Sequence, residues 1–305
     1  MKTKCLIVIP VGPGTNHDFL TDTLESIHFH IGTNPDEAII CLINDSGENL
    51  NNIEYISKCK NIIIEKAKDY GKEKNRSRPV NGPLFGKIIS CVEKLYSTIE
   101  FDVYLKIDTD TLITGNNPHL DAIEYFKKNP DVGILGSYKR KGDGKDKTGG
   151  MKLKGDMLQK EITFPHYLRN FRLMKNLKNV ILKSKANPYY TLGDTVTGGG
   201  YFINPDVFRK LNEQNIFNDV LRFSLVGEDT LFALLASAVG FKLSDPDSEN
   251  NFMAINWRGL PMPLEEIVTK NKKILHPVKL KEQQQEREIR NFFKILRSNK
   301  NTFKD

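Results

Sequence analysis

The sequence predicts an α/β fold in which a mostly parallel central sheet is flanked by helices. Short apolar runs alternate with segments of helical spacing over roughly the first half of the chain, and several of these runs end at polar or glycine-containing turns. Because consecutive parallel strands need a crossover connection, usually a helix, this alternation favours a doubly wound sheet. Ligands bind such sheets at the carboxyl ends of the strands.

The elements of the first half follow in order along the chain. The apolar run KCLIVIPV (residues 4–11) predicts a buried strand, and residues 17–30 place Leu20, Leu24 and Ile27 on one helical stripe. The same criteria predict strands over 38–45, 61–67, 101–110 and 132–138, and helices over 83–97 and near 119–128.

The second half contains fewer periodic segments. Residues 139–156 are rich in glycine and lysine without an apolar period, which predicts a mobile loop or an irregular insertion. Three glycines within 196–208 precede an aromatic strand that enters a helix at Pro205, and another helix is expected from Glu228. Residues 274–279 read as a short turn, and residues 279–298 as a basic helix with an apolar side.

Composition limits the classes of protein that fit. We expect a single domain over residues 1–278, followed by a basic helix and tail (279–305). The formal net charge is +7, but the lysines are dispersed and no nucleic-acid-binding signature accompanies them, so no nucleic acid is expected as a partner. The four cysteines lack CxxC spacing, which is typical of a reducing compartment and predicts a cytoplasmic protein.

Two aspartates end the strand over 101–110. Asp108 and Asp110 share one face of an extended chain, and like charges held close require a cation or a shared proton. A calcium-binding hand is excluded, because Ile113 and His119 stand where its glycine and glutamate would be. A phosphatase of the haloacid-dehalogenase type, whose motif is DxDGT, is a near match without the Gly-Thr. The third reading is a DxD motif, in which the carboxylates hold Mn²⁺ or Mg²⁺ against a diphosphate.

The order of the later motifs favours the third reading. The aspartate pair is followed by GGGY at 198–201, GED at 227–229 and the late histidine in ILHPVK. Alone, these would be a tight bend, a helix cap and an ordinary histidine. In this order, over most of residues 1–280, they resemble the GT-A-fold glycosyltransferases, with a Rossmann-like sheet, and most closely the inverting fringe-like and related families. NDSG departs from the double aspartate, glycine and serine of many members, and the segment around Lys87 matches only loosely.

The resemblance implies a transfer of a sugar from a nucleotide-sugar, a UDP-sugar, to a hydroxyl acceptor. It also implies that the domain consists of a nucleotide-binding half (1–115) and an acceptor half (116–278). Asp108, Asp110 and His276 would hold Mn²⁺ or Mg²⁺, and Lys279 would neutralise a phosphate oxygen. The other donor-binding residues that the resemblance implies are Pro10, Val11, Asp45, Lys87 and, again, Asp108.

The resemblance also implies the catalytic groups. Asp229 would be the general base and Glu228 would hold sugar hydroxyls, which gives inversion, although a retaining reaction stays open. Gly199 and Gly200 would line the acceptor side. Trp257 would stack on a sugar ring, with burial as a core anchor as the alternative. The enzyme class is then a hexosyl- or N-acetylhexosaminyltransferase, and the alternatives are the phosphatase and a catalytically silent sugar- or nucleotide-binding module.

The basic helix over 279–298 has two readings. Its cations and the apolar side containing Phe292 and Phe293 would suit peripheral contact with the inner face of a membrane, where a lipid-linked, glycan or protein acceptor could be reached. Docking of the Phe-Phe pair on the catalytic domain is the alternative.

Overall fold

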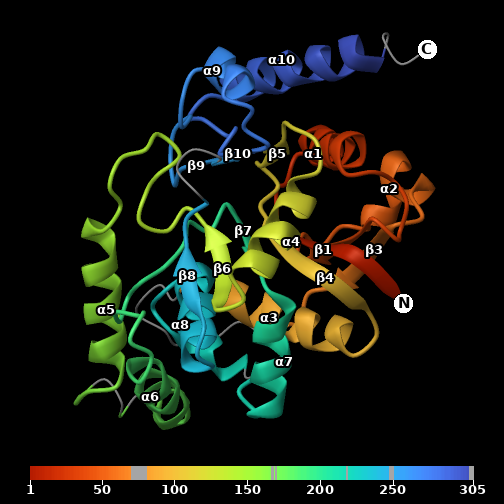
Figure 1. Cartoon of the computed structure of the whole chain (residues 1–305). Coiled ribbons are helices and arrows are strands. Elements are labelled where there is room, and N and C mark those ends of the chain that lie inside the picture. Colours follow the sequence, from red (N-terminus) through yellow and green to blue (C-terminus); the bar gives the residue numbers. More distant parts are fainter. Residues whose placement is uncertain (70–80, 166–167, 169, 218, 247–250, 302–305) are drawn as a thin grey trace.

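A computed structural model describes residues 1–69, 81–165, 168, 170–217, 219–246 and 251–301 (Figure 1). Within them, seven strands form the central sheet in the order β3-β2-β1-β4-β7-β6-β8. In that order the strands are Ile62–Lys66, Ala38–Asn44, Lys2–Val11, Glu100–Ile107, Gly200–Ile203, Val132–Gly136 and Lys242–Ser244. The predicted α/β class is confirmed.

Most neighbouring strands of the central sheet are parallel, and β7 is the exception. It pairs antiparallel with both β4 and β6. Its first residue, Gly200, lies opposite Ile107 at the carboxyl end of β4. The glycines that lead into β7 are therefore placed beside the aspartates that follow β4.

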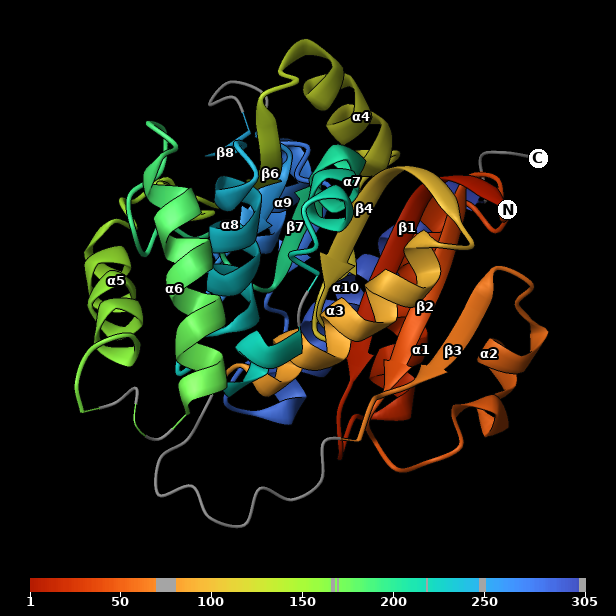
Figure 2. The same cartoon turned by 90° about the horizontal axis from the view of Figure 1, so that it is seen from below.

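Helices cover both faces of the sheet (Figure 2). The apolar side chains fall into two large clusters, one on each side of β1, β2 and β4, because successive residues of a strand point to opposite faces. On one face lie α3 (Pro83–Tyr96), α7 (Pro205–Glu213) and α8 (Glu228–Ala238), with α6 (Phe171–Lys185) packed on α8. On the other lie α1 (His17–His30) and α4 (Pro118–Lys128).

Short helices complete the fold around these layers. They are η1 (Leu50–Asn52), α2 (Glu54–Lys58), η3 (Asp219–Phe223) and α9 (Leu264–Thr269).

The prediction of a loop or irregular insertion over 139–156 was wrong for residues 149–156, which are helical. Residues 149–161 form helix α5 (Gly149–Glu161), which buries Met151 and Leu158. A side chain at Gly155 would lie 2.3 Å from the carbonyl oxygen of Leu192, so close backbone packing holds this helix. Two buried apolar residues a full two turns apart are too few for a recognisable helical period, which is why the sequence did not reveal α5.

A second, three-stranded sheet joins the C-terminal part of the chain to the centre. It consists of β5 (Leu112–Ile113), β10 (Ile274–His276) and β9 (Met253–Ile255). Leu275 pairs with Leu112, which follows the aspartates by two residues. The expected short turn over 274–279 thus begins as a strand, and this strand carries His276 to the aspartates.

The expected C-terminal helix is present as α10 (Gln283–Asn301). Its apolar side packs on the small sheet and α9 through the buried residues Ile289 and Phe293, and it lies next to α1 (Figure 1). Residues 302–305 of the expected tail lie outside the described residues. Among the helices that the structure describes, none combines the length and the apolar character needed to cross a bilayer.

Candidate functional site

The predicted residues Pro10, Val11, Asp45, Asp108 and Asp110 lie at the carboxyl ends of β1, β2 and β4 or directly after them. The chain runs from β1 outward to β2 and β3 and then returns to β4 on the other side of β1. This reversal of strand order opens a crevice between the ends of β1 and β4, where α/β sheets bind their ligands. Asp108 directly follows β4, and Asp45 directly follows β2.

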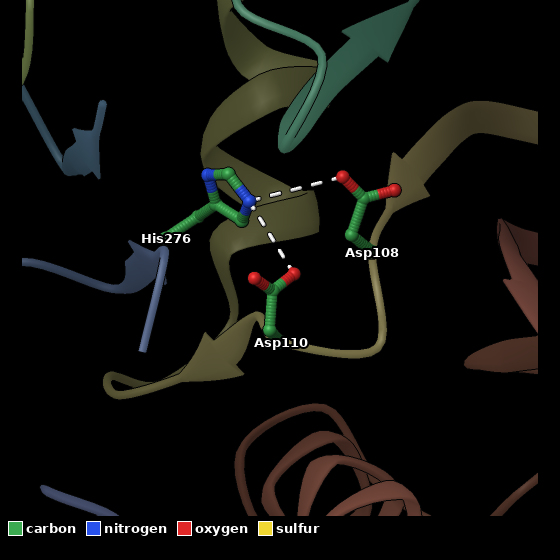
Figure 3. A group of neighbouring side chains, drawn as sticks. All are labelled: Asp108, Asp110 and His276. Atoms are coloured by element: carbon green, nitrogen blue, oxygen red, sulfur yellow. Dashed lines mark ion pairs between the residues drawn. The ribbon is translucent and has the colours of Figure 1, made fainter. Parts of the chain in front are cut away.

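Asp108, Asp110 and His276 point toward one another (Figure 3). Nε2 of His276 lies 3.7 Å from Oδ2 of Asp108 and 3.4 Å from Oδ1 of Asp110. One ligand atom from each of the three residues lies within 4.8 Å of the other two. In a six-coordinate site with bonds of about 2.1 Å, neighbouring ligand atoms are about 3 Å apart. A small inward movement of the three side chains would therefore let their ligand atoms bind one divalent cation.

The hydrogen bonding of His276 indicates which of its nitrogens is available. Nδ1 lies 2.9 Å from the backbone carbonyl oxygen of Asn256, which can only accept, so Nδ1 carries the proton. A neutral imidazole with its proton on Nδ1 would offer the lone pair of Nε2 to a cation between the two carboxylates, and a backbone carbonyl is one of the usual partners of the other nitrogen in a metal-binding histidine. The donor set fits a divalent cation such as Mn²⁺ or Mg²⁺.

The consecutive glycines make room for this cluster. A Cβ atom at Gly199 would lie 1.9 Å from Nδ1 of His276, so no other residue fits there with the ring in place. A Cβ atom at Gly198 would lie 2.9 Å from Oε1 of Glu228. The turn into β7 is therefore tight because a histidine and a glutamate pack directly against its backbone.

Lys106 connects the aspartate pair to the acids of α8. Its side chain is 1% exposed, and Nζ donates to Oδ1 of Asp108 at 2.6 Å and to the carbonyl oxygen of Gly198 at 2.5 Å. Nζ also lies 3.1 Å from Oε1 of Glu228. Burial would lower the pKa of Lys106, but the two carboxylates outweigh burial and raise it. Because Lys106 occupies Oδ1 of Asp108, Oδ2 is the oxygen that faces His276.

Glu228 and Asp229 begin α8 and have opposite electrostatic environments. Burial raises the pKa of Glu228, with the charges of Asp229 and Asp108 adding to it and Lys106 opposing it. Burial also acts to raise the pKa of Asp229, but the charge of Lys154, 3.0 Å from its Oδ2, and a hydrogen bond from the Thr230 amide lower it overall. Asp229 is thus held ionised, whereas Glu228 is the more basic carboxylate.

Lys147 lies behind this pair and is poorly solvated. Its Nζ donates to the carbonyl oxygens of Ser137 at 2.8 Å and Thr195 at 3.2 Å. Burial, together with the charge of Lys154, lowers its pKa to about 7, although Asp229 acts in the opposite direction. Near neutral pH, this lysine can change its charge beside Asp229.

The predicted donor residues lie around the aspartates in two groups. Asp45 forms an ion pair with Lys87 of α3, and its amide donates to the carbonyl oxygen of Val11 at 2.8 Å. The side chain of Val11 is buried in the core, and that of Pro10 is partly buried. Lys279, on the other side, lines a cavity of about 330 Å³ together with Asp110 and the loop before α1.

The predicted acceptor residues do not form one group. Gly199 contacts His276, whereas Gly200 faces the core at Ile255 and Ile274. Trp257 is 75% exposed, and the guanidinium carbon of Arg258 lies 4.2 Å from its ring centroid. Its exposure excludes the core-anchor alternative.

Several residues of the site were not identified from the sequence. Lys106 was detectable in principle, since it is a lysine in an apolar strand two residues before Asp108 and so shares its face. Lys147 and Lys154 lie in the segment that the sequence analysis assigned to a loop. The Asn256 carbonyl leaves no signal in the sequence, because any residue supplies one.

No family model matches the chain, and a search of curated proteins finds no similar sequence. Crystal structures of S. aureus TarS are similar in fold over 81% of this chain. The match to TarS 1–349 has 16% sequence identity and a TM-score of 0.43, and it covers 58% of that chain. The match to TarS has 14% sequence identity and a TM-score of 0.44, and it covers 35% of that chain. The match to TarS 1–349 in complex with UDP-GlcNAc has 15% sequence identity and a TM-score of 0.42, and it covers 56% of that chain. The chain therefore spans less than two thirds of each structure, and similarity this low does not establish a shared family or activity.

Proposed function

We propose that this chain is a metal-dependent glycosyltransferase that moves a sugar from a UDP-sugar to a hydroxyl acceptor with inversion. The observation that carries the proposal is the convergence of His276 Nε2 on the carboxylates of Asp108 and Asp110, at the point where the strand order reverses. This placement agrees with the GT-A resemblance in the sequence.

The donor would bind across the ends of β1, β2 and β4. Asp45 and Lys87 would contact the nucleoside at the edge formed by Pro10 and Val11, and Lys279 would pair with a phosphate oxygen. A divalent cation bound to the aspartates and histidine would stabilise the negative charge that develops on the departing diphosphate. Lys106 would keep Asp108 turned so that one oxygen remains available.

Asp229 would accept the proton of the acceptor hydroxyl. A base must be ionised before the reaction, and Lys154 keeps Asp229 ionised. The same ion pair weakens the base, so we propose that acceptor binding displaces Lys154 from Asp229. Glu228, fixed by Lys106, would hold a sugar hydroxyl, and Trp257 would offer a surface for stacking.

The acceptor, the transferred sugar and the location of the protein are the remaining parts of the proposal. The acceptor would be a glycan, a lipid-linked glycan or a protein, and the transferred sugar a hexose or an N-acetylhexosamine. We also propose a cytoplasmic location with peripheral contact at the inner membrane face. The exposed cations Lys281, Arg287 and Lys294 support it, but the apolar side of α10 is already packed on the protein.

A donor panel tests the proposed function. The full chain is incubated with UDP-glucose, UDP-galactose, UDP-GlcNAc and UDP-GalNAc plus Mn²⁺, and UDP release is measured with and without EDTA. We expect slow hydrolysis of at least one donor that EDTA abolishes and added Mn²⁺ restores. Release of UDP that is unchanged in EDTA would contradict the metal dependence. Hydrolysis of a phosphomonoester without any donor turnover would support the phosphatase instead.

A further inference from the structure

The C-terminal helix contacts the loop that carries the two aspartates through one buried arginine. Arg290 of α10 is 3% exposed, and its Nη2 donates to the carbonyl oxygen of Thr109 at 3.1 Å. Thr109 is the residue between Asp108 and Asp110. The arginine thus binds the backbone of the loop midway between the two proposed metal ligands.

The same carbonyl is held from a second helix. Oγ1 of Thr23 in α1 donates to the carbonyl oxygen of Thr109 at 3.0 Å, and Nη1 of Arg290 lies 3.2 Å from that hydroxyl. The amide of Val278, just before α10, donates to the carbonyl oxygen of Asp110 at 2.9 Å. Two consecutive carbonyls of the loop are therefore fixed by groups from α1 and from the C-terminal segment.

The guanidinium itself is held in one orientation. Nη1 donates to Oδ2 of Asp22 at 3.0 Å, and Nε donates to Oε1 of Glu286 at 3.0 Å. The planar guanidinium donates hydrogen bonds in three directions, through Nε, Nη1 and Nη2. A lysine ammonium cannot reproduce this geometry. An arginine so constrained transmits the position of α10 to the loop.

Within the described residues, a second arginine of α10, Arg297, anchors the helix to α1 without contacting the aspartate loop. Arg297, also buried, forms an ion pair with Oδ1 of Asp22. Among the contacts of the described residues, Arg297 has no bond to the aspartate loop. Both arginines therefore bind the same carboxylate of α1, but only Arg290 reaches Thr109.

We propose that Arg290 is a positioning residue that holds the Asp108–Asp110 loop in its metal-binding geometry, which makes the docked α10 a part of the metal site. The proposal rests on the metal site of the proposed function. Groups that hydrogen-bond the metal ligands themselves typically change metal affinity by about 10- to 100-fold when they are removed. Arg290 binds the backbone between two proposed ligands, so we expect an effect at the lower end of this range.

Titration of the full chain with Mn²⁺, followed by electron paramagnetic resonance of the free ion, tests this without any donor or acceptor. We expect Arg290→Lys to weaken Mn²⁺ binding by about 10-fold or more. The matched control, Arg297→Lys, should lower the urea midpoint of unfolding and leave Mn²⁺ affinity within about twofold of the wild type. Thr23→Val removes the other bond to the Thr109 carbonyl on a different helix and should also weaken Mn²⁺ binding, so the test stands even if Arg290→Lys fails to fold.

Each other result would contradict the proposal. Unchanged Mn²⁺ affinity in folded Arg290→Lys, or in Thr23→Val, would show that the loop holds its geometry unaided. An equal loss in Arg297→Lys would assign the effect to helix docking in general. Absence of Mn²⁺ binding in the wild type would overturn the metal site itself and with it the proposed function.

Discussion

Lys106 shows how one residue can couple the two halves of the site. Its ammonium is buried, and removing one partner of a buried ion pair typically costs about 3–5 kcal/mol because a charge is left uncompensated. Three acceptors surround Nζ, on Asp108, Gly198 and Glu228. The orientations of the Asp108 and Glu228 carboxylates are therefore linked through the ammonium group of Lys106.

The two acids of α8 can be distinguished by their amide variants. Asp229→Asn keeps the shape of the side chain but cannot accept a proton, so we expect kcat to fall by about 10²- to 10⁴-fold with little change in UDP affinity. Glu228→Gln should raise the KM more than it lowers kcat, because Glu228 is assigned to hydroxyl binding. Steady-state kinetics and UDP titration of both variants measure this.

The opposite pattern would reassign the roles. A large loss of kcat in Glu228→Gln alone would make the more basic glutamate the general base. A large loss of UDP affinity in Asp229→Asn with kcat preserved would move Asp229 to the donor side and support a retaining reaction.

At the scale of elements, α10 uses its two sides differently. Ile289 and Phe293 are buried against the small sheet, and Arg290 and Arg297 point into the interface with α1. The cations Arg287 and Lys294 stay exposed. This is the docking alternative of the sequence analysis, so a membrane contact would have to use the exposed cations and not the apolar side.

Sedimentation with liposomes tests that contact. We expect the full chain to sediment with anionic vesicles at low salt and to be released at high salt, since each surface cation contributes about 1 kcal/mol and is screened. Arg287→Glu combined with Lys281→Glu should reduce sedimentation without changing the urea midpoint by much. A protein that stays in the supernatant at low salt would rule out the peripheral contact.

At the scale of the whole molecule, buried histidines make stability depend on pH. Burial lowers the pKa of His119 and of His28 below the ordinary value of 6.5. As the pH falls through about 6.5 the unfolded chain binds protons that the folded chain does not, so the folded state loses stability toward acid by up to about 1.4 kcal/mol per pH unit and histidine.

Urea unfolding at pH 7.5, 6.5 and 5.5 measures this dependence. His119 is 0% exposed, and its ring nitrogens form no hydrogen bond, although Nε2 lies 3.7 Å from Oε2 of Glu37. The variant His119→Leu therefore removes the contribution of the histidine together with this one polar contact. We expect the unfolding free energy of the wild type to fall more between pH 7.5 and 5.5 than that of the variant. If the unfolding free energies of the wild type and the variant fell equally with pH, His119 would have the same pKa in the folded and unfolded chains, which would contradict this expectation.

The sequence predicted the layers of the fold better than the details of the site. Apolar runs such as 4–11 and 38–45 are buried on both faces, which their composition alone indicates. The proposed ligands Asp108, Asp110 and His276 were identified because their order along the chain resembles that of a known family. Their supports were not, because the contacts of Arg290 with Asp22 or of Lys106 with Glu228 join residues far apart in the chain. Such pairing depends on the tertiary structure. Helix α5 was missed because its buried apolar residues, Met151 and Leu158, are too few to produce a helical period.

A crystal grown with Mn²⁺ and UDP, with anomalous diffraction recorded at the manganese edge, tests the central claim most directly. We predict one anomalous peak within bonding distance of Asp108 Oδ2, an Asp110 oxygen and His276 Nε2, with a diphosphate oxygen of UDP completing the coordination. Bound UDP without manganese at these three residues, with His276 instead hydrogen-bonded directly to the carboxylates, would contradict the metal-dependent mechanism.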